Sequence, residues 1–371
     1  MKITFPHMGN TYIAVKALFD DLGVDYIIPP FNNKRALEIG TKYAPEMACL
    51  PLKINLGNYI EAYEKGADTI LITGGCGPCR FGYYCEMSRE ILADNGYNMD
   101  MITLELPNGD IKEFIRRVKK LAGGFNLYKI LKVVKDTTLV SKRVDELERL
   151  TFKIRPRELK RGTTDRIYKS FLSRVKQVRG SGEIQKLVED TKSQLLRIEV
   201  DKDFKPLKVG IVGEIYTTID PYSNFNIESI LGHMGVEVDR SNMISGWIIE
   251  HMLKAIVPFK KDIRYKEAAK PYLGTMIGGH AQETIGNTVI YANKGYDGVV
   301  QIYPLTCMPE IVAESILPAI ERDYNIPILT LIIDEMTGEA GYMTRIEAFA
   351  DLLKKRRERM EYGENFALSG N

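Results

Sequence analysis

Three of the five cysteines in this 371-residue chain lie close together, at Cys76, Cys79 and Cys85. They follow the apolar run 69–72 and a pair of glycines, in the segment Gly74-Gly75-Cys76-Gly77-Pro78-Cys79. Closely spaced thiolates are typical ligands of a soft metal centre, and spacings of two and five intervening residues favour an iron–sulfur cluster over a structural disulfide. The glycines let the backbone approach a cofactor closely, and the proline stiffens the loop. We therefore expect this segment to bind a metal ion or a cluster.

The remaining cysteines, Cys49 and Cys307, are distant from this segment in the sequence. Cys49 lies in the loop 45–51 ahead of a predicted helix, and Cys307 directly follows an apolar strand pattern. Either residue alone could be a small buried hydrophobe instead of a ligand. Zinc is the main alternative to an iron–sulfur cluster, because four thiolates also make a structural zinc site. A redox pair at Cys76 and Cys79 is a weaker alternative, since it leaves the other thiols unexplained.

Other polar residues follow predicted strands or precede predicted helices. Asp334 and Glu335 end a predicted strand and are the carboxylates best placed for proton transfer. His7 follows the first predicted strand, where it could line a cleft. His280 follows two glycines at the start of a predicted helix, where it caps the helix, lies in the core or contributes a ligand. Arg80, next to Cys79, could offset the charge of a cluster or hydrogen-bond a sulfide.

Alternating strand and helix patterns must position these residues. The N-terminal region, residues 1–120, predicts strands at 2–5, 24–28, 69–72 and 99–106, with helices at 12–22, 34–43, 56–65 and 86–93. Residues 121–205 carry Lys, Arg, Glu and Leu at helical spacing and predict a helical bridge. Residues 206–371 resume the alternation, with strands at 207–212, 236–238, 298–303 and 328–333. We predict an α/β protein of two Rossmann-like domains, each a doubly wound parallel sheet, joined by the bridge.

The two α/β regions share a weak internal repeat. Lys65-Gly66-Ala67-Asp68 and Lys294-Gly295-Tyr296-Asp297 each precede a strand, and Leu56-Gly57-Asn58 matches Ile285-Gly286-Asn287. Cys76 then corresponds to Cys307, and Cys49 to His280. Ligands of open α/β sheets bind beyond the carboxyl ends of the strands, near helix N-termini that stabilise thiolates. A pseudo-twofold axis would therefore turn the thiols of both domains toward one cleft.

Composition narrows the class of protein. The chain is 44% hydrophobic and 27% charged with a net charge of +2, which is typical of a globular protein. It contains no apolar run long enough for a membrane span and no signal-peptide core at its N-terminus, so we expect a cytoplasmic protein with reduced thiols. Residues 151–180 are rich in Lys and Arg. This stretch could bind nucleic acid, although a solvated helical face explains it more simply.

The chain resembles the acyl-CoA dehydratase activase-related proteins, relatives of the D-component of 2-hydroxyacyl-CoA dehydratases and of double-cubane cluster proteins. The resemblance covers essentially the whole chain, and its most specific segments are Ile3–Asn10, Glu46–Lys53, Gly74–Gly82 and Asp334 with Arg345–Phe349. It implies two Rossmann-like domains with an iron–sulfur cluster between them. It also implies electron transfer at low potential in anaerobic metabolism, from an ATP-hydrolysing activase of the sugar-kinase/actin type that carries its own 4Fe–4S cluster. The relatives further suggest a homodimer.

The resemblance assigns Cys49, Cys76 and Cys307 to the ligand positions of the dehydratases, while Cys79 and Cys85 are additions to that pattern. A double cubane (8Fe–9S) needs more thiolates than the five in this chain, unless a group such as His280 contributes. We therefore predict a 4Fe–4S cluster held by Cys49, Cys76, Cys79 and Cys307, with Cys85 as a possible fifth ligand. The predicted protein accepts electrons from the activase and passes them to a substrate or a reductase. The alternatives are a 2-hydroxyacyl-CoA dehydratase-like subunit and a zinc-stabilised structural or nucleic-acid-binding protein.

Overall fold

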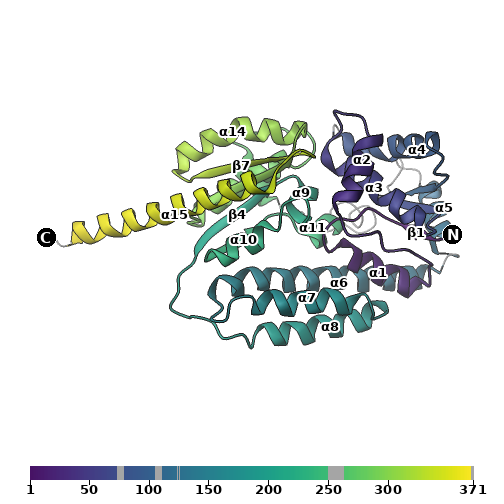
Figure 1. The fold of residues 1–371 in the computed structure, drawn as a ribbon, viewed down its shortest axis with the longest axis horizontal. Helices are drawn as coiled ribbons and strands as arrows, with labels where there is room; N and C mark the ends of the chain where they lie inside the picture. The colour runs from purple at the N-terminus through teal and green to yellow at the C-terminus, as the bar shows by residue number, and fades with distance from the viewer. Residues whose placement is uncertain (73–78, 105–110, 123, 125, 250–262, 369–371) are drawn as a thin grey trace.

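The structure is a computed structural model, and it describes residues 1–72, 79–104, 111–122, 124, 126–249 and 263–368. Cys76 and its neighbours in the segment 73–78 therefore lie outside the described residues. The chain forms an N-terminal α/β unit, a helical unit and a C-terminal α/β unit, shown from purple to yellow in Figure 1.

The N-terminal unit contains a parallel sheet in the order β1-β2-β3. Its elements are β1 (Ile3–Thr4), α1 (Thr11–Leu22), α2 (Lys34–Tyr43), α3 (Leu50–Glu64), β2 (Thr69–Ile72), the 3-10 helix η1 (Arg80–Tyr83), α4 (Tyr84–Asp94), β3 (Asp100–Thr103) and α5 (Ile111–Ala122). The predicted strand at 24–28 is reduced to one parallel bridge between Tyr26 and Ile3. Pro29 and Pro30 follow it, and prolines lack the amide donors that would extend the pairing.

Helix α3 begins at Leu50, six residues before the start that the sequence predicted. Residues 50–62 are all buried, so this part of the helix has no polar face and gives no amphipathic signal. Pro51 lies in the first turn, where its missing amide costs nothing. The earlier start makes Cys49 the N-cap residue of α3.

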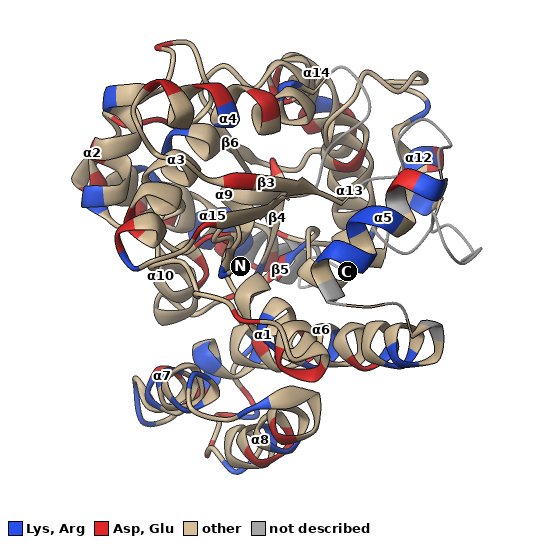
Figure 2. Cartoon of the chain, turned by 90° about the vertical axis from the view of Figure 1, so that its right-hand side faces the viewer, with Lys and Arg blue, Asp and Glu red and all other residues tan. Residues whose placement is uncertain are grey.

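The helical unit consists of α6 (Leu127–Ile154), the 3-10 helix η2 (Arg155–Arg157), α7 (Thr163–Val175) and α8 (Gly180–Leu195). Figure 1 shows these helices stacked along one side of the molecule, below both α/β units. Ion pairs join α6 to α8, between Arg143 and Glu189 (3.6 Å) and between Lys192 and Glu146 (3.9 Å). Acidic and basic residues alternate along the helices of this unit (Figure 2).

The C-terminal unit contains a parallel sheet in the order β5-β4-β6-β7. Its elements are β4 (Leu207–Gly213), α9 (Ile215–Ile219), α10 (Ile227–His233), β5 (Val236–Arg240), α11 (Ile244–Ile248), α12 (Arg264–Ala269), α13 (Ala281–Asn293), β6 (Gly298–Pro304), α14 (Met308–Tyr324), β7 (Ile328–Ile333) and α15 (Glu339–Leu368). Helix α15 extends away from the body of the molecule toward the C-terminus (Figure 1). The predicted α/β class is confirmed, because both sheets are parallel and flanked by helices.

The two sheets repeat the same connections and register. The segment around Tyr26 lies beside β1 as β5 lies beside β4, and the pairing of Ile3 with Thr69 matches that of Val209 with Gly298. Asp68 accepts a hydrogen bond from the backbone N of Lys2 (2.8 Å). In the second unit, Asp297 accepts one from the backbone N of Lys208 (2.7 Å). The Lys-Gly-x-Asp repeat thus sets the start of equivalent strands.

The repeat also extends to helix packing. A Cβ atom on Gly57 of α3 would lie 1.8 Å from the carbonyl oxygen of Ala36 in α2. A Cβ atom on Gly286 of α13 would lie 1.9 Å from the carbonyl oxygen of Tyr265 in α12. Each glycine therefore permits a backbone contact that no other residue allows.

The two α/β units and the helical unit share their cores. Met8, Leu50 and Ile54 of the N-terminal unit belong to the same buried cluster as the strands of the C-terminal unit. Helix α1 shares a second cluster with α6, α7 and α8. Among the described residues, none of the helices combines the length and the apolar character needed to traverse a lipid bilayer.

Candidate metal centre at the domain interface

Three of the predicted ligand thiols lie at helix N-termini. Cys49 is the N-cap of α3, Cys79 is the N-cap of η1, which leads into α4, and Cys307 is the N-cap of α14. All three residues are partly buried, with the side chains of Cys49 and Cys79 in one unit and that of Cys307 in the other. Helix N-termini carry positive partial charge, which favours a thiolate or an anionic cluster.

Arg80 connects the loops that carry these thiols. Its guanidinium donates from Nη1 to the backbone O of Met47 (2.9 Å) and from Nη2 to the backbone O of Thr306 (2.6 Å). Nη2 also lies 2.9 Å from Thr306 Oγ1, and that hydroxyl donates to the same Met47 carbonyl (3.3 Å). Met47 is two residues before Cys49, and Thr306 immediately precedes Cys307. The residue next to Cys79 thus ties the two loops together across the interface.

The three thiols share one electrostatic environment. Burial raises the pKa of Cys49 to about 11, and the charges of Glu214 and Cys79 also raise it, against the lowering effects of Tyr84 and Arg80. Burial likewise raises the pKa of Cys79, with a further rise from Glu214. For Cys307, burial raises the pKa most, followed by Glu214 and Glu310, and Cys49 also raises it. Cys49 is therefore within electrostatic reach of both Cys79 and Cys307, and burial makes all three favour the protonated thiol.

Glu214 brings a carboxylate from the C-terminal unit to this site. It is the N-cap of α9, and its carboxylate accepts hydrogen bonds from the backbone N of Tyr216 (3.0 Å) and Thr217 (3.0 Å). The sequence places it in the turn after β4, but a turn residue does not reveal which thiols it faces. Glu214 and Cys307 belong to the same unit, and the packing of the two units brings Glu214 within electrostatic reach of Cys49 and Cys79 as well.

Cys49 adjoins a pocket on the surface. Its Sγ lies 2.7 Å from the hydroxyl of Tyr84, and its backbone N donates to the same hydroxyl (3.3 Å). Tyr84 forms part of a pocket of about 340 Å³, together with Met47, Arg80 and Met87. Tyr84 therefore both contacts the thiol and lines the pocket. Sequence reasoning missed Tyr84, because no local pattern marks it as a partner of Cys49.

Cys85 occupies a different environment. It lies in the first turn of α4 and is buried, with its Sγ 3.0 Å from Thr103 Oγ1 of β3. This side chain belongs to the packing of α4 on the sheet. Cys76, the centre of the predicted motif, lies outside the described residues.

His7 is buried at the end of β1. Its ring contacts Tyr12 and Phe31, and its Nδ1 has no hydrogen-bond partner among the described residues. Burial, together with the charge of Lys176, lowers its pKa to about 3, so the ring is neutral. The backbone O of His7 accepts from Asn32 (3.4 Å), in the polar contact between the units.

His280 is the N-cap of α13 and is partly buried, although its side chain does not cap the helix. The preceding Gly279 has φ +55°, and a Cβ atom there would lie 2.7 Å from Pro309 in the first turn of α14. The loop before α13 therefore packs beside the helix that Cys307 begins. This position matches that of Cys49 at the start of α3, as the repeat predicts.

Asp334 and Glu335 take part in structural contacts. Asp334 Oδ1 accepts from the backbone N of Met336 (2.9 Å) and from Thr337 Oγ1 (2.8 Å), which fixes the turn after β7. Glu335 forms an ion pair with the buried Lys53 of α3, across the two units. Both carboxylates are partly exposed and hold structural contacts through one oxygen each, and a role in proton transfer stays a prediction.

Sequence reasoning also missed Glu310, one turn after Cys307. It is fully buried and accepts from Thr284 Oγ1 (3.0 Å) and Gln301 Nε2 (3.0 Å). Burial raises its pKa to about 8 against these hydrogen bonds, which favours the protonated carboxyl. The sequence pattern that could have identified it is a single glutamate within an apolar stretch of a predicted helix, which indicates a buried carboxyl group.

No group of three or more His, Cys, Asp or Glu side chains in the described part of the chain is spaced to hold a metal ion as it stands. The geometry thus brings the three thiol loops together without setting the sulfurs in a finished coordination shell. In comparisons with protein-family models and with curated proteins, no match was found.

Proposed function

We propose that this protein is an iron–sulfur electron-transfer protein whose cluster lies between its two α/β units. The observation that carries the proposal is the Arg80 contact, which ties the loop of Cys49 to that of Cys307 beside Cys79. A buried, partly apolar site with three thiols from separate loops has the donor chemistry that iron–sulfur clusters require. A structural disulfide would use two of these thiols and leave the third without a role.

The proposed ligands are Cys49, Cys79 and Cys307, with Cys76 as the fourth thiol. Cys85 is left out of the set because its Sγ is buried against Thr103 Oγ1 in the packing of α4 on β3. Because the pKa values of these thiols are raised, binding of the cluster must displace their protons. Cluster incorporation should therefore be favoured at alkaline pH. When bound, a cluster supplies one-electron redox chemistry. Arg80 and the three helix N-termini stabilise negative charge there.

The electron donor and acceptor follow from the resemblance in the sequence. We infer that an ATP-hydrolysing activase with its own 4Fe–4S cluster supplies the electrons. The acceptor is a small molecule or a downstream reductase. The pocket beside Tyr84 gives a small molecule access to the neighbourhood of Cys49.

The test is anaerobic purification with iron, zinc and acid-labile sulfide analysis, followed by EPR of the reduced protein. We expect a brown protein with about four irons per chain. Cys49→Ser, Cys79→Ser and Cys307→Ser should each lower the iron content and change the EPR signal. Cys85→Ser is the matched control and should retain iron.

Two outcomes would change the proposal. A colourless protein with a single zinc ion would overturn it in favour of a structural metal site. An iron content of about eight would indicate a double cubane and require further ligands, with His280 the first to substitute. Reduction of the purified protein by an activase with ATP, but not with ADP, would then test the proposed electron source.

A further inference from the structure

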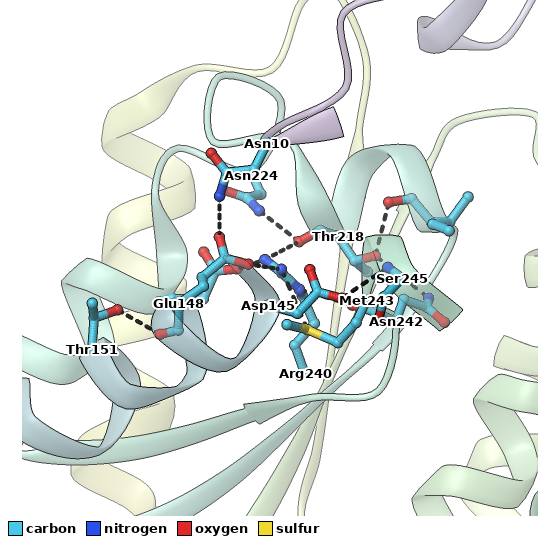
Figure 3. A network of polar contacts seen from close by, with 12 residues as sticks. Asn10, Asp145, Glu148, Thr151, Thr218, Asn224, Arg240, Asn242, Met243 and Ser245 are labelled. Carbon is cyan, nitrogen blue, oxygen red and sulfur yellow. Dashed lines mark hydrogen bonds and ion pairs between the residues drawn. The ribbon is translucent and has the colours of Figure 1, made fainter. Parts of the chain in front are cut away.

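A cluster of buried charged residues lies at the junction of all three units (Figure 3). Its centre is Arg240 at the end of β5, which is 1% exposed. Arg240 donates from Nη1 to Glu228 Oε1 of α10 (2.6 Å) and from Nη2 to Glu148 Oε2 of α6 (2.5 Å). The guanidinium therefore joins the helical unit to two elements of the C-terminal unit.

Acidic groups outnumber basic groups in this cluster. Asp145, one turn before Glu148 on α6, is also buried. Its Oδ2 accepts from the backbone N of Ser245 (2.8 Å), while its Oδ1 has no hydrogen-bond partner among the described residues. The exposed Arg149 also acts on Asp145, so two guanidinium groups, only one of them buried, face three buried carboxylates. Uncompensated buried charge is costly. The folded protein therefore favours a state in which the cluster holds a proton.

Glu148 also contacts the N-terminal unit. Its Oε1 accepts from Asn10 Nδ2 (3.1 Å), and the same Nδ2 lies 2.7 Å from the hydroxyl of Tyr168 on α7. Asn10 is the N-cap of α1 and follows the loop that leaves β1. Glu148 is thus the carboxylate at which the two α/β units and the helical unit meet.

We propose that Glu148 is a proton-dependent latch, which fastens the helical unit to both α/β units when its carboxyl is protonated and loosens the junction when it ionises. With the proton in place, Arg240 is matched by Glu228. Without it, a buried negative charge is added beside Glu228 and Asp145. Repulsion then acts between α6 and α10, the elements that Arg240 joins.

The charged surroundings of Glu148 support this. Burial raises its pKa to about 7, Arg240 lowers it, and Glu228 and Asp145 raise it. Tyr168 faces it from α7 and stays neutral, because burial raises the pKa of the phenol. A neighbouring set of Arg155, Asp165 and His233 also joins η2 and α7 to α10.

The direction of the pH dependence follows from the linkage between proton binding and folding. A carboxyl with a higher pKa in the folded protein than in the unfolded chain binds its proton more tightly when folded. Its contribution to stability is therefore greatest below the unfolded value of 4.5 and is lost as the pH rises toward about 7. The latch does not depend on the proposed cluster. If that function holds, the latch would also affect how the thiol loops face one another, because α6 packs on α1 as well as on β5.

The test compares the full-length wild type with Glu148→Gln, which keeps the shape, has one acceptor and one donor group like the protonated carboxyl, and cannot ionise. Glu146→Gln is the matched control on the same helix, since that side chain is 63% exposed. The thermal midpoint is measured from pH 5 to pH 8.5, and hydrogen exchange of the α6 amides is measured over the same range after correction for intrinsic rates. Neither readout involves the thiols, so the result is independent of iron binding.

We expect the wild type and Glu146→Gln to lose several degrees of midpoint and to exchange faster along α6 as the pH rises. Glu148→Gln should lose less and keep its α6 amides protected at pH 8. Glu228→Gln serves as a second variant and should move the transition to lower pH, because it removes a like charge that raises the Glu148 pKa and leaves Arg240 to pair with Glu148 alone. A transition that moves to higher pH would contradict the coupling. A Glu148→Gln profile that follows the wild type would overturn the latch, as would unchanged transitions in both variants.

Discussion

The N-terminal and C-terminal α/β units have the same sheet connections but different chemistry at their carboxyl edges. Arg117 of α5 donates to the backbone O of Thr103 on β3 (2.8 Å), and Arg345 of α15 donates to that of Thr330 on β7 (2.6 Å). Each edge strand is thus covered by an arginine from the following helix. The packing contacts of the scaffold recur in both units.

The residues around the site do not recur. The first unit supplies Cys49 and Cys79, whereas the second supplies Cys307, the buried Glu310 and, in place of Cys49, His280. Contacts that fix backbone geometry tolerate few residue types, while the first residues of a helix tolerate many. The repeated residues therefore fix the backbone framework of both units, whereas the residues that differ between the units supply the candidate ligands. The following predictions test that separation.

The largest effect should come from the paired glycines. Gly57→Ala and Gly286→Ala should each destabilise the protein by about 3 kcal/mol, because the new methyl group would meet a carbonyl oxygen of the neighbouring helix. Urea unfolding measures both. Gly182→Ala in α8 is the control, since nothing lies within 4 Å of its Cβ position, and it should be neutral or slightly stabilising. Markedly unequal losses at the two paired sites would break the equivalence of the units.

The thiols of the two units should respond differently to one substitution. In iron-free protein at pH 7, Cys49 should alkylate about a hundredfold more slowly than a free thiol, because its raised pKa leaves little thiolate. The rate should rise as the pH approaches 11. Tyr84→Phe removes the hydrogen bond that lowers this pKa, so it should slow Cys49 further and leave Cys307 unchanged. Mass spectrometry of alkylated peptides measures both rates, and an equal effect on both would contradict the assigned contact.

The repeated aspartates should differ in strength. Asp297 also pairs with Arg357 (2.6 Å), and its side chain is 19% exposed, whereas that of Asp68 is 55% exposed. We expect Asp297→Ala to cost about 2 kcal/mol and Asp68→Ala less than about 1 kcal/mol in urea unfolding. Arg357→Ala should account for most of the difference. Equal costs would mean that the shared strand contact, and not the ion pair, dominates.

The smallest effect should come from the edge arginines. Arg117→Ala and Arg345→Ala each remove one charged donor to an edge carbonyl and should cost about 0.5–1 kcal/mol. Arg117 also pairs with Glu113 (2.9 Å), so its loss should be the larger of the two. Urea unfolding gives the costs, and size-exclusion chromatography checks whether an uncovered edge promotes association. A larger cost at Arg345 would reverse the expected order.

Much of the fold was predictable from short patterns. The Lys-Gly-x-Asp motif and the matching glycines identified equivalent strands and helices, since a glycine or a strand start is encoded within a few residues. The early start of α3 was not predictable from periodicity, because a helix buried on all sides has no polar face. The predicted strand at 24–28 is too long, because its apolar residues give the pattern of a strand while only Tyr26 pairs with a neighbour, Ile3.

By itself, the sequence determined the α/β class, the repeat and the residues at the ends of strands, because these depend on local periodicity and backbone freedom. Only the tertiary structure decided which of those ends meet. Arg80 reaches Thr306 across 226 positions, and Glu148 reaches Arg240 across 92. Such contacts arise from the packing of whole units, so the residues next to each group in the sequence do not identify its partner. The same packing buries the groups and thereby shifts their pKa values.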